Sequence, residues 1–157
     1  TTDYCGSFVY EDNRLQYILT EVGRITFDYE LTYSGGPLPQ PMQSGYSRQN
    51  EYFLTDHLGN VRVIFTEDAN GDAVILQENH YYPFGMLMSG MGYTLASLTA
   101  PYHFNYNGQE LQQQTQLLDY GFRQLDPQLG RWHCVDKLAE SYISTSPYAY
   151  VTQNIIL

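Results

Sequence analysis

The side chains best suited to metal or nucleophilic chemistry are scattered along the sequence. Four histidines stand at His57, His80, His103 and His133. Zinc sites normally combine closely spaced ligands with Cys or carboxylate partners, so this spacing favours turn residues such as His57 over a metal site. The sequence contains no Gly-x-Ser-x-Gly segment, the turn that presents the serine nucleophile of many hydrolases. We therefore expect no metal, no cofactor and no hydrolase site.

The two cysteines, Cys5 and Cys134, lie far apart in the sequence. Their separation fits neither a metal knuckle nor a framework of disulfides. The pattern leaves the redox compartment and the disulfide state of both thiols open.

The charge balance excludes whole classes of partner. The sequence has 17 acidic and 7 basic residues, a formal charge of −10 that repels phosphate backbones and anionic lipids, so we expect no nucleic-acid partner. No apolar run approaches the ~20 residues that cross a bilayer. We expect no membrane insertion, and the first residues show no signal peptide.

The length of 157 residues, with 43% hydrophobic content, predicts a single folded domain.

The first third of the sequence predicts antiparallel strands. The chain contains 16 tyrosines, several of them in this third, and tyrosine is common on half-buried pleated surfaces. Ser7–Tyr10 and Leu15–Leu19 predict a hairpin, and the alternation of apolar and polar residues over Ile25–Tyr33 predicts a longer strand. Ser34–Ser47 contains three prolines that cannot donate to a ladder, so we expect a long loop there.

An antiparallel meander is predicted for the middle of the chain. The expected strands are Tyr52–Thr55, Val61–Thr66 and Ala73–Tyr82. Turns at Asp56–Asn60 and Asp68–Gly71 join them. In the first turn we expect a positive φ at Gly59 and a solvent-facing His57.

Short extended pieces separated by turns are predicted after residue 85. Met86–Ala100 has no clear period and predicts an irregular loop, whereas Glu110–Leu118 is compatible with a strand or with one or two helical turns. The remaining expected pieces are strands at Tyr102–Tyr106, Leu118–Arg123 and Arg131–Val135, and a short helix within Asp136–Tyr142. Adjacent strand residues point to opposite faces, so we expect Trp132 in the core and not stacked on Arg131. The fold class is thus mainly β, with at most short helices.

Four stretches occur in the order typical of one family: Tyr52–Arg62, Tyr81–Gly85, Leu117–Arg123 and Asp126–Trp132. Together they resemble the Rhs repeat-associated core domain of Rhs and YD-repeat proteins, in the form common in Bacteroidetes. The resemblance extends to Tyr150 and divides the chain into YD-repeat-like strands at 1–51 and a core at 52–157. Its motif residues, which we expect in turns and structural contacts, are Asp56, His57, Gly59, Asn60, Arg62, Asp119, Tyr120, Gly121, Arg123, Asp126, Pro127, Gly130, Arg131 and Trp132.

The resemblance implies a large hollow β-shell whose end the core domain closes, and in many relatives the shell encloses an exported C-terminal toxin. Relatives also cleave themselves with an Arg and an Asp that correspond to Arg131 and Asp136, together with a second Asp in a downstream Asp-Pro-x-Gly motif. Here Lys137 replaces the usual proline, and no downstream Asp-Pro-x-Gly occurs before Leu157. One acid and one base with separated pKa values are needed for such chemistry, so we expect no self-cleavage by this chain.

The leading hypothesis is a non-enzymatic shell segment of an exported or cell-surface Rhs-type protein. Its partners would be the remainder of the parent protein or other chains, bound through strand edges, and a possible toxin cargo. One alternative is an aspartate-dependent self-processing core whose second half lies beyond this chain. Another is a stand-alone module that binds protein or carbohydrate through exposed tyrosines.

Overall fold

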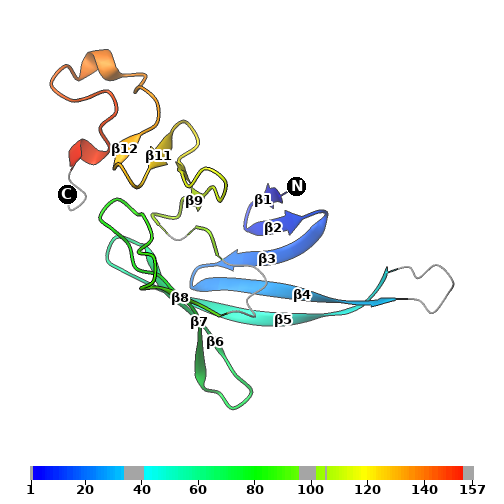
Figure 1. Ribbon diagram of the computed structural model, residues 1–157. Coiled ribbons are helices and arrows are strands. Elements are labelled where there is room, and N and C mark those ends of the chain that lie inside the picture. The colour runs from blue at the N-terminus through cyan, green and yellow to red at the C-terminus, as the bar shows by residue number, and fades with distance from the viewer. Residues whose placement is uncertain (1, 34–40, 96–101, 105, 154–157) are drawn as a thin grey trace. The chain divides into compact units, whose positions relative to one another are not determined.

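The computed structural model describes residues 2–33, 41–95, 102–104 and 106–153. Antiparallel strands and tight turns dominate these residues, and the helical elements are two 3-10 turns (Figure 1). The predicted fold class is confirmed. The part of the expected loop at 34–40, and parts of the segments expected at 86–100 and 102–106, lie outside the described residues.

The longer strands come first in the chain. They are β1 (Thr2–Cys5), β2 (Phe8–Glu11), β3 (Arg14–Thr20), β4 (Gly23–Tyr33), β5 (Pro41–Thr55), β6 (Val61–Glu67) and β7 (Ala73–Glu78). Short strands follow: β8 (Tyr93–Thr94), β9 (Glu110–Leu111), β10 (Leu118–Asp119), β11 (Gln124–Asp126) and β12 (Arg131–Trp132). The 3-10 turns are η1 (Ala139–Ser141) and η2 (Val151–Gln153).

The strands form two sheets among the described residues. β1 to β8 pair in chain order in an eight-stranded sheet, and a four-stranded sheet has the order β12-β11-β10-β9. The chain divides into two compact units, unit 1 at Thr1–Phe53 with Ile64–Ile75 and unit 2 at Leu54–Val63 with Leu76–Leu157. Length alone predicted one domain. The division follows the meander, which passes from unit 1 to unit 2 and back.

Unit 1 begins with one strand more than the sequence indicated. The predicted hairpin is β2 and β3, and its turn residues Asp12 and Asn13 have φ of 49° and 62°, the conformation that a tight hairpin turn requires. β1 precedes this hairpin and pairs with β2. All four of its residues are exposed, so no apolar alternation marked it as a strand.

The expected loop at Ser34–Ser47 is wrong for its second half. β5 starts at Pro41 and pairs with β4, with Pro41 opposite Tyr33. A proline is tolerated as the first residue of a strand because little pairing is lost there. Pairing with a long neighbour therefore overrode a local composition that favoured a loop.

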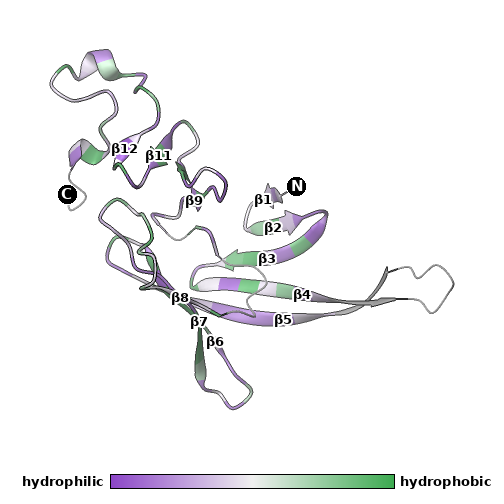
Figure 2. Cartoon of the chain, in the orientation of Figure 1, coloured by the Kyte–Doolittle hydropathy of each residue, from purple (hydrophilic) through white to green (hydrophobic). Residues whose placement is uncertain are grey.

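The β4–β5 pair encloses a buried ion pair. Arg24 and Glu51 are directly opposite in the ladder, and Arg24 Nε donates to Glu51 Oε2 at 2.7 Å. Their side chains are 0% and 2% exposed. The Thr26 hydroxyl donates to the other carboxylate oxygen at 3.2 Å. Along β3 and β4, hydrophobic and hydrophilic residues are mixed, so this sheet is not a purely apolar layer (Figure 2).

The turn that joins β5 to β6 behaves as the sequence predicted. Gly59 has φ of +82°, and His57 is exposed. The next turn also has a positive φ at Gly71, +89°.

Strands of unit 2 are shorter than predicted because turns interrupt them early. The strand expected at Ala73–Tyr82 ends at Glu78, Leu118–Arg123 is extended only at Leu118–Asp119, and Arg131–Val135 only at Arg131–Trp132. Within Met86–Ala100, Tyr93 and Thr94 pair with β7 as β8. The segment Glu110–Leu118, which was compatible with strand or helix, begins with β9 and ends at the first residue of β10. A turn with φ of 59° at Gln116 lies between them. The expected short helix is the single 3-10 turn η1.

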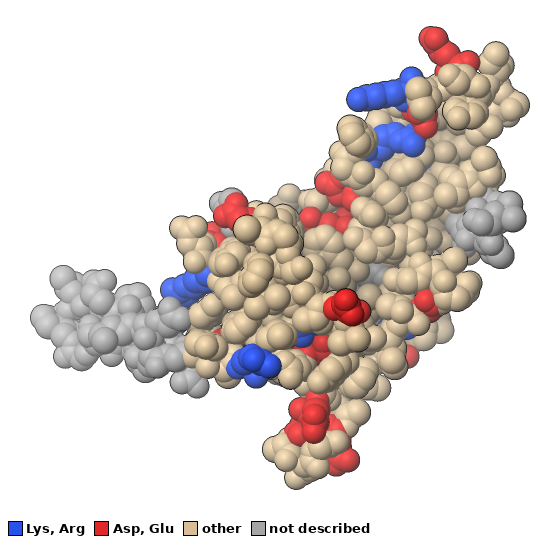
Figure 3. Space-filling view, turned by 180° about the vertical axis from the view of Figure 1, so that it is seen from behind, with Lys and Arg blue, Asp and Glu red and all other residues tan. Residues whose placement is uncertain are grey.

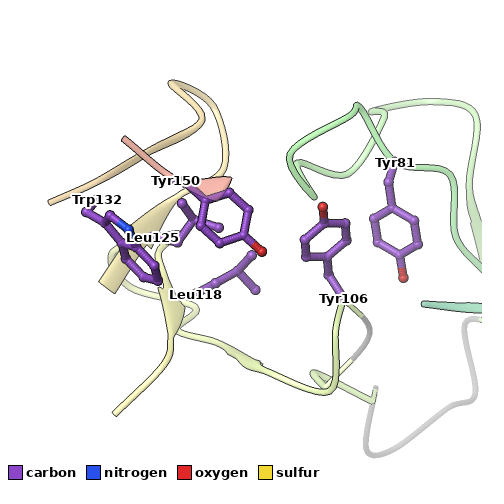
Figure 4. Close-up of a cluster of buried hydrophobic side chains, with 6 residues drawn as sticks. All are labelled: Tyr81, Tyr106, Leu118, Leu125, Trp132 and Tyr150. Atoms are coloured by element: carbon purple, nitrogen blue, oxygen red, sulfur yellow. The ribbon is translucent and has the colours of Figure 1, made fainter. Parts of the chain in front are cut away.

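Six side chains from separated segments form the core of unit 2: Tyr81, Tyr106, Leu118, Leu125, Trp132 and Tyr150. Figure 4 shows Trp132, Tyr150 and the two leucines grouped together, with Tyr106 facing Tyr81. Leu125 is fully buried and Trp132 is 9% exposed, so the prediction that Trp132 lies in the core is confirmed.

Candidate functional site

The turn between β5 and β6 is built around one carboxylate. Asp56 accepts hydrogen bonds from the backbone N–H groups of Leu58 and Asn60, both at 3.0 Å. Its second oxygen accepts from the Asn60 side-chain amide and from Arg62 Nε, each at 3.0 Å. Burial alone would raise the pKa of Asp56, but these hydrogen bonds outweigh it and hold the pKa below its usual value. The ionised carboxylate therefore holds the turn together.

Asn60 links this turn to the aromatic core. It is 3% exposed, and its Oδ1 accepts from the backbone N–H of Asn107 at 3.0 Å. The Asn107 amide donates to the hydroxyls of Tyr120 at 3.2 Å and Tyr150 at 3.1 Å. These two hydroxyls lie 2.9 Å apart. A continuous chain of hydrogen bonds thus runs from Asp56 to Tyr150.

Three buried or half-buried tyrosines around this network have raised pKa values. Burial raises the pKa of Tyr106 to about 12 and raises those of Tyr81 and Tyr120 as well. Trp132 packs edge-on against both Tyr120 and Tyr150, with ring centroids 5.2 Å apart in each pair. The raised pKa values keep the hydroxyls of Tyr81, Tyr106 and Tyr120 protonated at neutral pH, so these hydroxyls can donate hydrogen bonds.

Asp136 is paired with Arg123 and not with Arg131. Arg123 Nη1 donates to Asp136 Oδ2 at 2.5 Å, and its guanidinium lies 4.1 Å above the Trp132 ring. The other Asp136 oxygen accepts from the Leu138 backbone N–H at 2.8 Å. Arg131 is exposed in β12, opposite Asp126. The cation that stacks on Trp132 is thus Arg123, for which the sequence predicted no contact with Trp132.

This geometry favours an ionised Asp136. The hydrogen bond from Leu138 and the nearby Arg123 together lower its pKa, against a smaller effect of burial. Self-cleavage by a carboxyl pair needs one protonated and one ionised partner. The structure brings Asp136 to a guanidinium, an arrangement suited to fixing a loop.

The remaining motif residues shape tight turns. Asp119 accepts from the Gly121 N–H at 2.7 Å, and Gly121 has φ of +80°. Asp126 accepts from the N–H groups of Gln128 and Leu129, both at 2.9 Å. The other two residues of this second turn, Pro127 and Gly130, are buried. These contacts place Asp119, Gly121 and the Asp126–Gly130 segment in tight turns.

A cavity of about 390 Å³ opens beside the Arg123–Asp136 pair. Trp132, Tyr142 and Tyr150 form aromatic parts of its lining, and the segment 145–152 forms much of the rest. Backbone hydrogen bonds from Trp132 to Tyr148 and from Asp136 to Pro147, both 2.9 Å, hold this segment against β12. The Arg123–Asp136 pair therefore lies beside the point where segment 145–152 pairs with Trp132 and Asp136.

The remaining groups of chemical interest in the described residues are the possible metal ligands and the two thiols. In that part of the chain no group of three or more His, Cys, Asp or Glu side chains is placed to hold a metal ion. Cys5 and Cys134 are exposed free thiols. No helix in the described segments is long and apolar enough to cross a membrane.

Three residues with structural contacts are not among the motif residues: Asn107 in the turn network, and Arg24 with Glu51 in the β4–β5 pair. The sequence predicted no role for any of the three. A signal existed for the last two: each is a charged residue directly before a predicted strand, where a charge needs a partner if it is buried.

The turn network makes a testable contribution to stability. We expect Asp56→Asn to lower the free energy of unfolding at neutral pH by about 1.5–3 kcal/mol, because hydrogen bonds to a charged group are lost. A lowered folded-state pKa stabilises the fold above the usual value of 3.8 and ceases to do so as the pH falls below it. The wild-type chain should therefore lose more stability than Asp56→Asn between pH 5 and pH 3.

Urea unfolding followed by Trp132 fluorescence at each pH measures this difference. Glu140→Gln, an exposed change in η1, is the control and should follow the wild type. Parallel pH profiles for the wild type and Asp56→Asn would contradict the role assigned to Asp56.

Solved toxin-complex structures share this fold. The crystal structure of TcdB2-TccC3 aligns with 96% of this chain and 7% of that chain, at a TM-score of 0.60 and 18% identity. The Photorhabdus luminescens Tc holotoxin pore with a TccC3 mutation aligns with 99% of this chain and 7% of that chain, at a TM-score of 0.58 and 18% identity. These likenesses show the fold.

Sequence comparison identifies the family. Salivary gland surface protein 1 of Aedes aegypti is 33% identical over 108 residues, which is 68% of this chain and 3% of that protein. This chain therefore spans only a small part of the length of its relatives. The family described as Teneurin YD-shell matches residues 2–153, nearly all of the sequence. This confirms the resemblance to Rhs and YD-repeat proteins, and the chain belongs to the Teneurin YD-shell family.

Proposed function

We propose that this chain is a structural, non-enzymatic segment of the β-shell of a longer Rhs/YD-repeat protein, and that the intact shell encloses or delivers a C-terminal toxin. The observation that carries the proposal is the family match over residues 2–153. Within the segment, 1–51 would supply YD-repeat-like strands and 52–157 the core. The motif side chains support a structural role, because the side-chain oxygens of Asp56, Asn60 and Asp126 accept hydrogen bonds from backbone N–H groups of turns.

A free strand edge supports assembly with the remainder of the parent protein. β1 is at the end of the sheet order, and its four residues are exposed. Such an edge presents N–H and C=O groups that can pair with another strand. One of the similar solved structures, TcdB2-TccC3-Cdc42, is named after several proteins, which supports association with other proteins.

The family favours an exported or cell-surface location for the intact parent. The relative from Aedes aegypti is named as a surface protein. Among the described residues seen in Figure 3, basic side chains are few, which supports the expectation that nucleic acid is not a partner.

Limited proteolysis of the intact parent protein tests encapsulation. We expect the polypeptide after the core to resist trypsin while the shell is intact, and to be digested when Leu125→Asp opens the core of this segment. The exposed change Glu140→Gln serves as the control. Equal digestion of that polypeptide in the wild type and in Leu125→Asp would contradict enclosure by the shell.

Self-processing is the alternative function, and we expect it to be absent from this chain. Asp136 is engaged with Arg123, and the second carboxyl of the family arrangement has no counterpart in the sequence. Intact mass after long incubation at acidic and neutral pH should equal the mass of the complete chain. A fragment that forms in the wild type and disappears in Asp136→Asn would establish self-cleavage.

A further inference from the structure

The cavity beside the Arg123–Asp136 pair combines apolar walls with one cation and one anion. Its volume of about 390 Å³ lies within the range of about 300–1,000 Å³ that is usual for small-molecule sites. The apolar part of its lining includes Trp132, Tyr142, Pro147, Tyr150 and Val151. Every residue of the lining belongs to unit 2. The cavity therefore lies within one compact unit, and its size and lining suit a small organic molecule.

The Arg123–Asp136 pair retains unused hydrogen-bonding capacity. One guanidinium N–H donates to Asp136, and no other N–H of Arg123 has a partner in the described part of the chain. Each Asp136 oxygen accepts one hydrogen bond, from Arg123 or from the Leu138 backbone N–H, although a carboxylate oxygen can accept two. The side chains of Arg123 and Asp136 are 25% and 35% exposed, so a ligand can reach both. The pair therefore offers a charged donor and a charged acceptor side by side.

Tyr142 gives the cavity an aromatic wall that the fold itself leaves uncovered. The residue is 62% exposed, and within the described ranges its side chain makes no hydrogen bond and no ring contact. Trp132 and Tyr150, by contrast, pack edge-on against each other in the core. A ligand ring that packs on Tyr142 removes apolar surface from water, which favours a ligand with an aromatic group.

Backbone strain occurs in the lining of the same cavity. Val151 and Thr152 have φ of 41° and 50°, and Gln153 follows with 62°. A positive φ is costly for β-branched residues, and such strain gathers at ligand sites where the surrounding contacts maintain it. Gln153 holds this turn, because its Nε2 donates to the Gly130 carbonyl at 3.0 Å and its backbone N–H donates to the Tyr150 carbonyl at 2.8 Å. The strained turn is thus a wall that these contacts keep in place.

The two charges of the pair select for a ligand that carries both signs. An anion gains from Arg123 but is repelled by Asp136, and a cation meets the reverse. A zwitterion avoids both costs, because its carboxylate lies beside Arg123 and its ammonium beside Asp136, so that four charges alternate in sign. An α-amino acid has these two groups on one carbon atom, which suits two partners that are joined by a single hydrogen bond.

We propose that this cavity binds a free α-amino acid with an aromatic side chain. The carboxylate of the ligand accepts from unused N–H groups of Arg123, and its ammonium donates to Asp136. The aromatic ring of the ligand packs against Tyr142. The ion pair stays intact in this arrangement, so binding needs no proton transfer to Asp136. The proposal does not depend on the shell function proposed above.

Calorimetric titration of the 157-residue chain with L-phenylalanine tests the site. Three simpler molecules separate the contributions: phenethylamine lacks the carboxylate, hydrocinnamate lacks the ammonium, and glycine lacks the ring. We expect saturable binding of L-phenylalanine and at least about tenfold weaker affinity for each of the three, because each loses a charged hydrogen bond or the apolar contact. Failure of L-phenylalanine to bind, or equal affinity for any of the three simpler molecules, would overturn the proposal.

Two variants locate the site, and a third is their control. Arg123→Gln removes the cation and should weaken L-phenylalanine binding about tenfold or more. Arg48→Gln makes the same change at an exposed position of unit 1 and should bind as the wild type does. Tyr142→Ala removes the uncovered wall and should weaken binding severalfold with the fold intact, because this side chain makes no contact of its own among the described residues.

Far-UV circular dichroism shows whether each variant is folded. If Arg123→Gln does not fold, the titrations of Tyr142→Ala and of the three simpler molecules decide the question without it. Unchanged affinity in Tyr142→Ala, or equal losses of affinity in Arg123→Gln and Arg48→Gln, would assign binding to another part of the chain and overturn the proposal.

Discussion

Replacing Glu51 with alanine is expected to lower the free energy of unfolding by about 3–5 kcal/mol, one of the two largest effects foreseen for this chain. Arg24 and Glu51 are 0% and 2% exposed, so the substitution leaves a guanidinium in a site that water does not reach. The Tyr17 ring, 5.0 Å from the guanidinium carbon, cannot replace a carboxylate. Urea unfolding monitored by far-UV circular dichroism measures the loss.

Two further variants separate loss of the ion pair from a general intolerance of change at this site. Glu67→Ala removes an exposed carboxylate from the same unit and should change stability by no more than about 0.5 kcal/mol. The double variant Arg24→Met with Glu51→Leu removes both charges and should lose much less than Glu51→Ala, because no charge stays buried. If Glu51→Ala costs as little as Glu67→Ala, the pair does not stabilise the β4–β5 register.

Gly130→Ala is expected to destabilise unit 2 by about 2–5 kcal/mol, the sum of two costs. Gly130 has φ of +64°, where a side chain is strained, and a Cβ there would come within 2.5 Å of the Phe84 ring. Gly108 has the same φ of +64° but has nothing within 4 Å of its Cβ position. Gly108→Ala should therefore cost only the backbone strain, about 1–2 kcal/mol.

Trp132 fluorescence during urea unfolding is suited to this comparison. The sequence contains 1 tryptophan, and it belongs to the core cluster against which Phe84 packs. The difference between the two variants isolates the collision with Phe84. Equal losses for Gly130→Ala and Gly108→Ala would show that the ring moves aside without cost, and that the Asp126–Gly130 turn does not need a glycine for space.

Features governed by neighbouring residues were predictable from the sequence. The alternation over Ile25–Tyr33 corresponds to β4, and the hairpin predicted from Ser7–Tyr10 and Leu15–Leu19 is β2 with β3. The positive φ of Gly59 followed from its place in a turn. These features depend on side-chain direction, turn geometry and backbone sterics, all of which act over a few residues. The ordered motifs also identified the family before any contact was known.

Pairing partners were decided only by the tertiary structure. Arg123 and Arg131 both precede Asp136 in the sequence. In the structure Arg123 pairs with Asp136, and its guanidinium also lies on the Trp132 ring. Arg24 and Glu51 are 27 residues apart and meet only because β4 and β5 pair in one register. The strand that begins at Pro41 likewise exists because β4 supplies its hydrogen bonds. Register and stacking join residues distant in sequence, so local composition does not encode them individually.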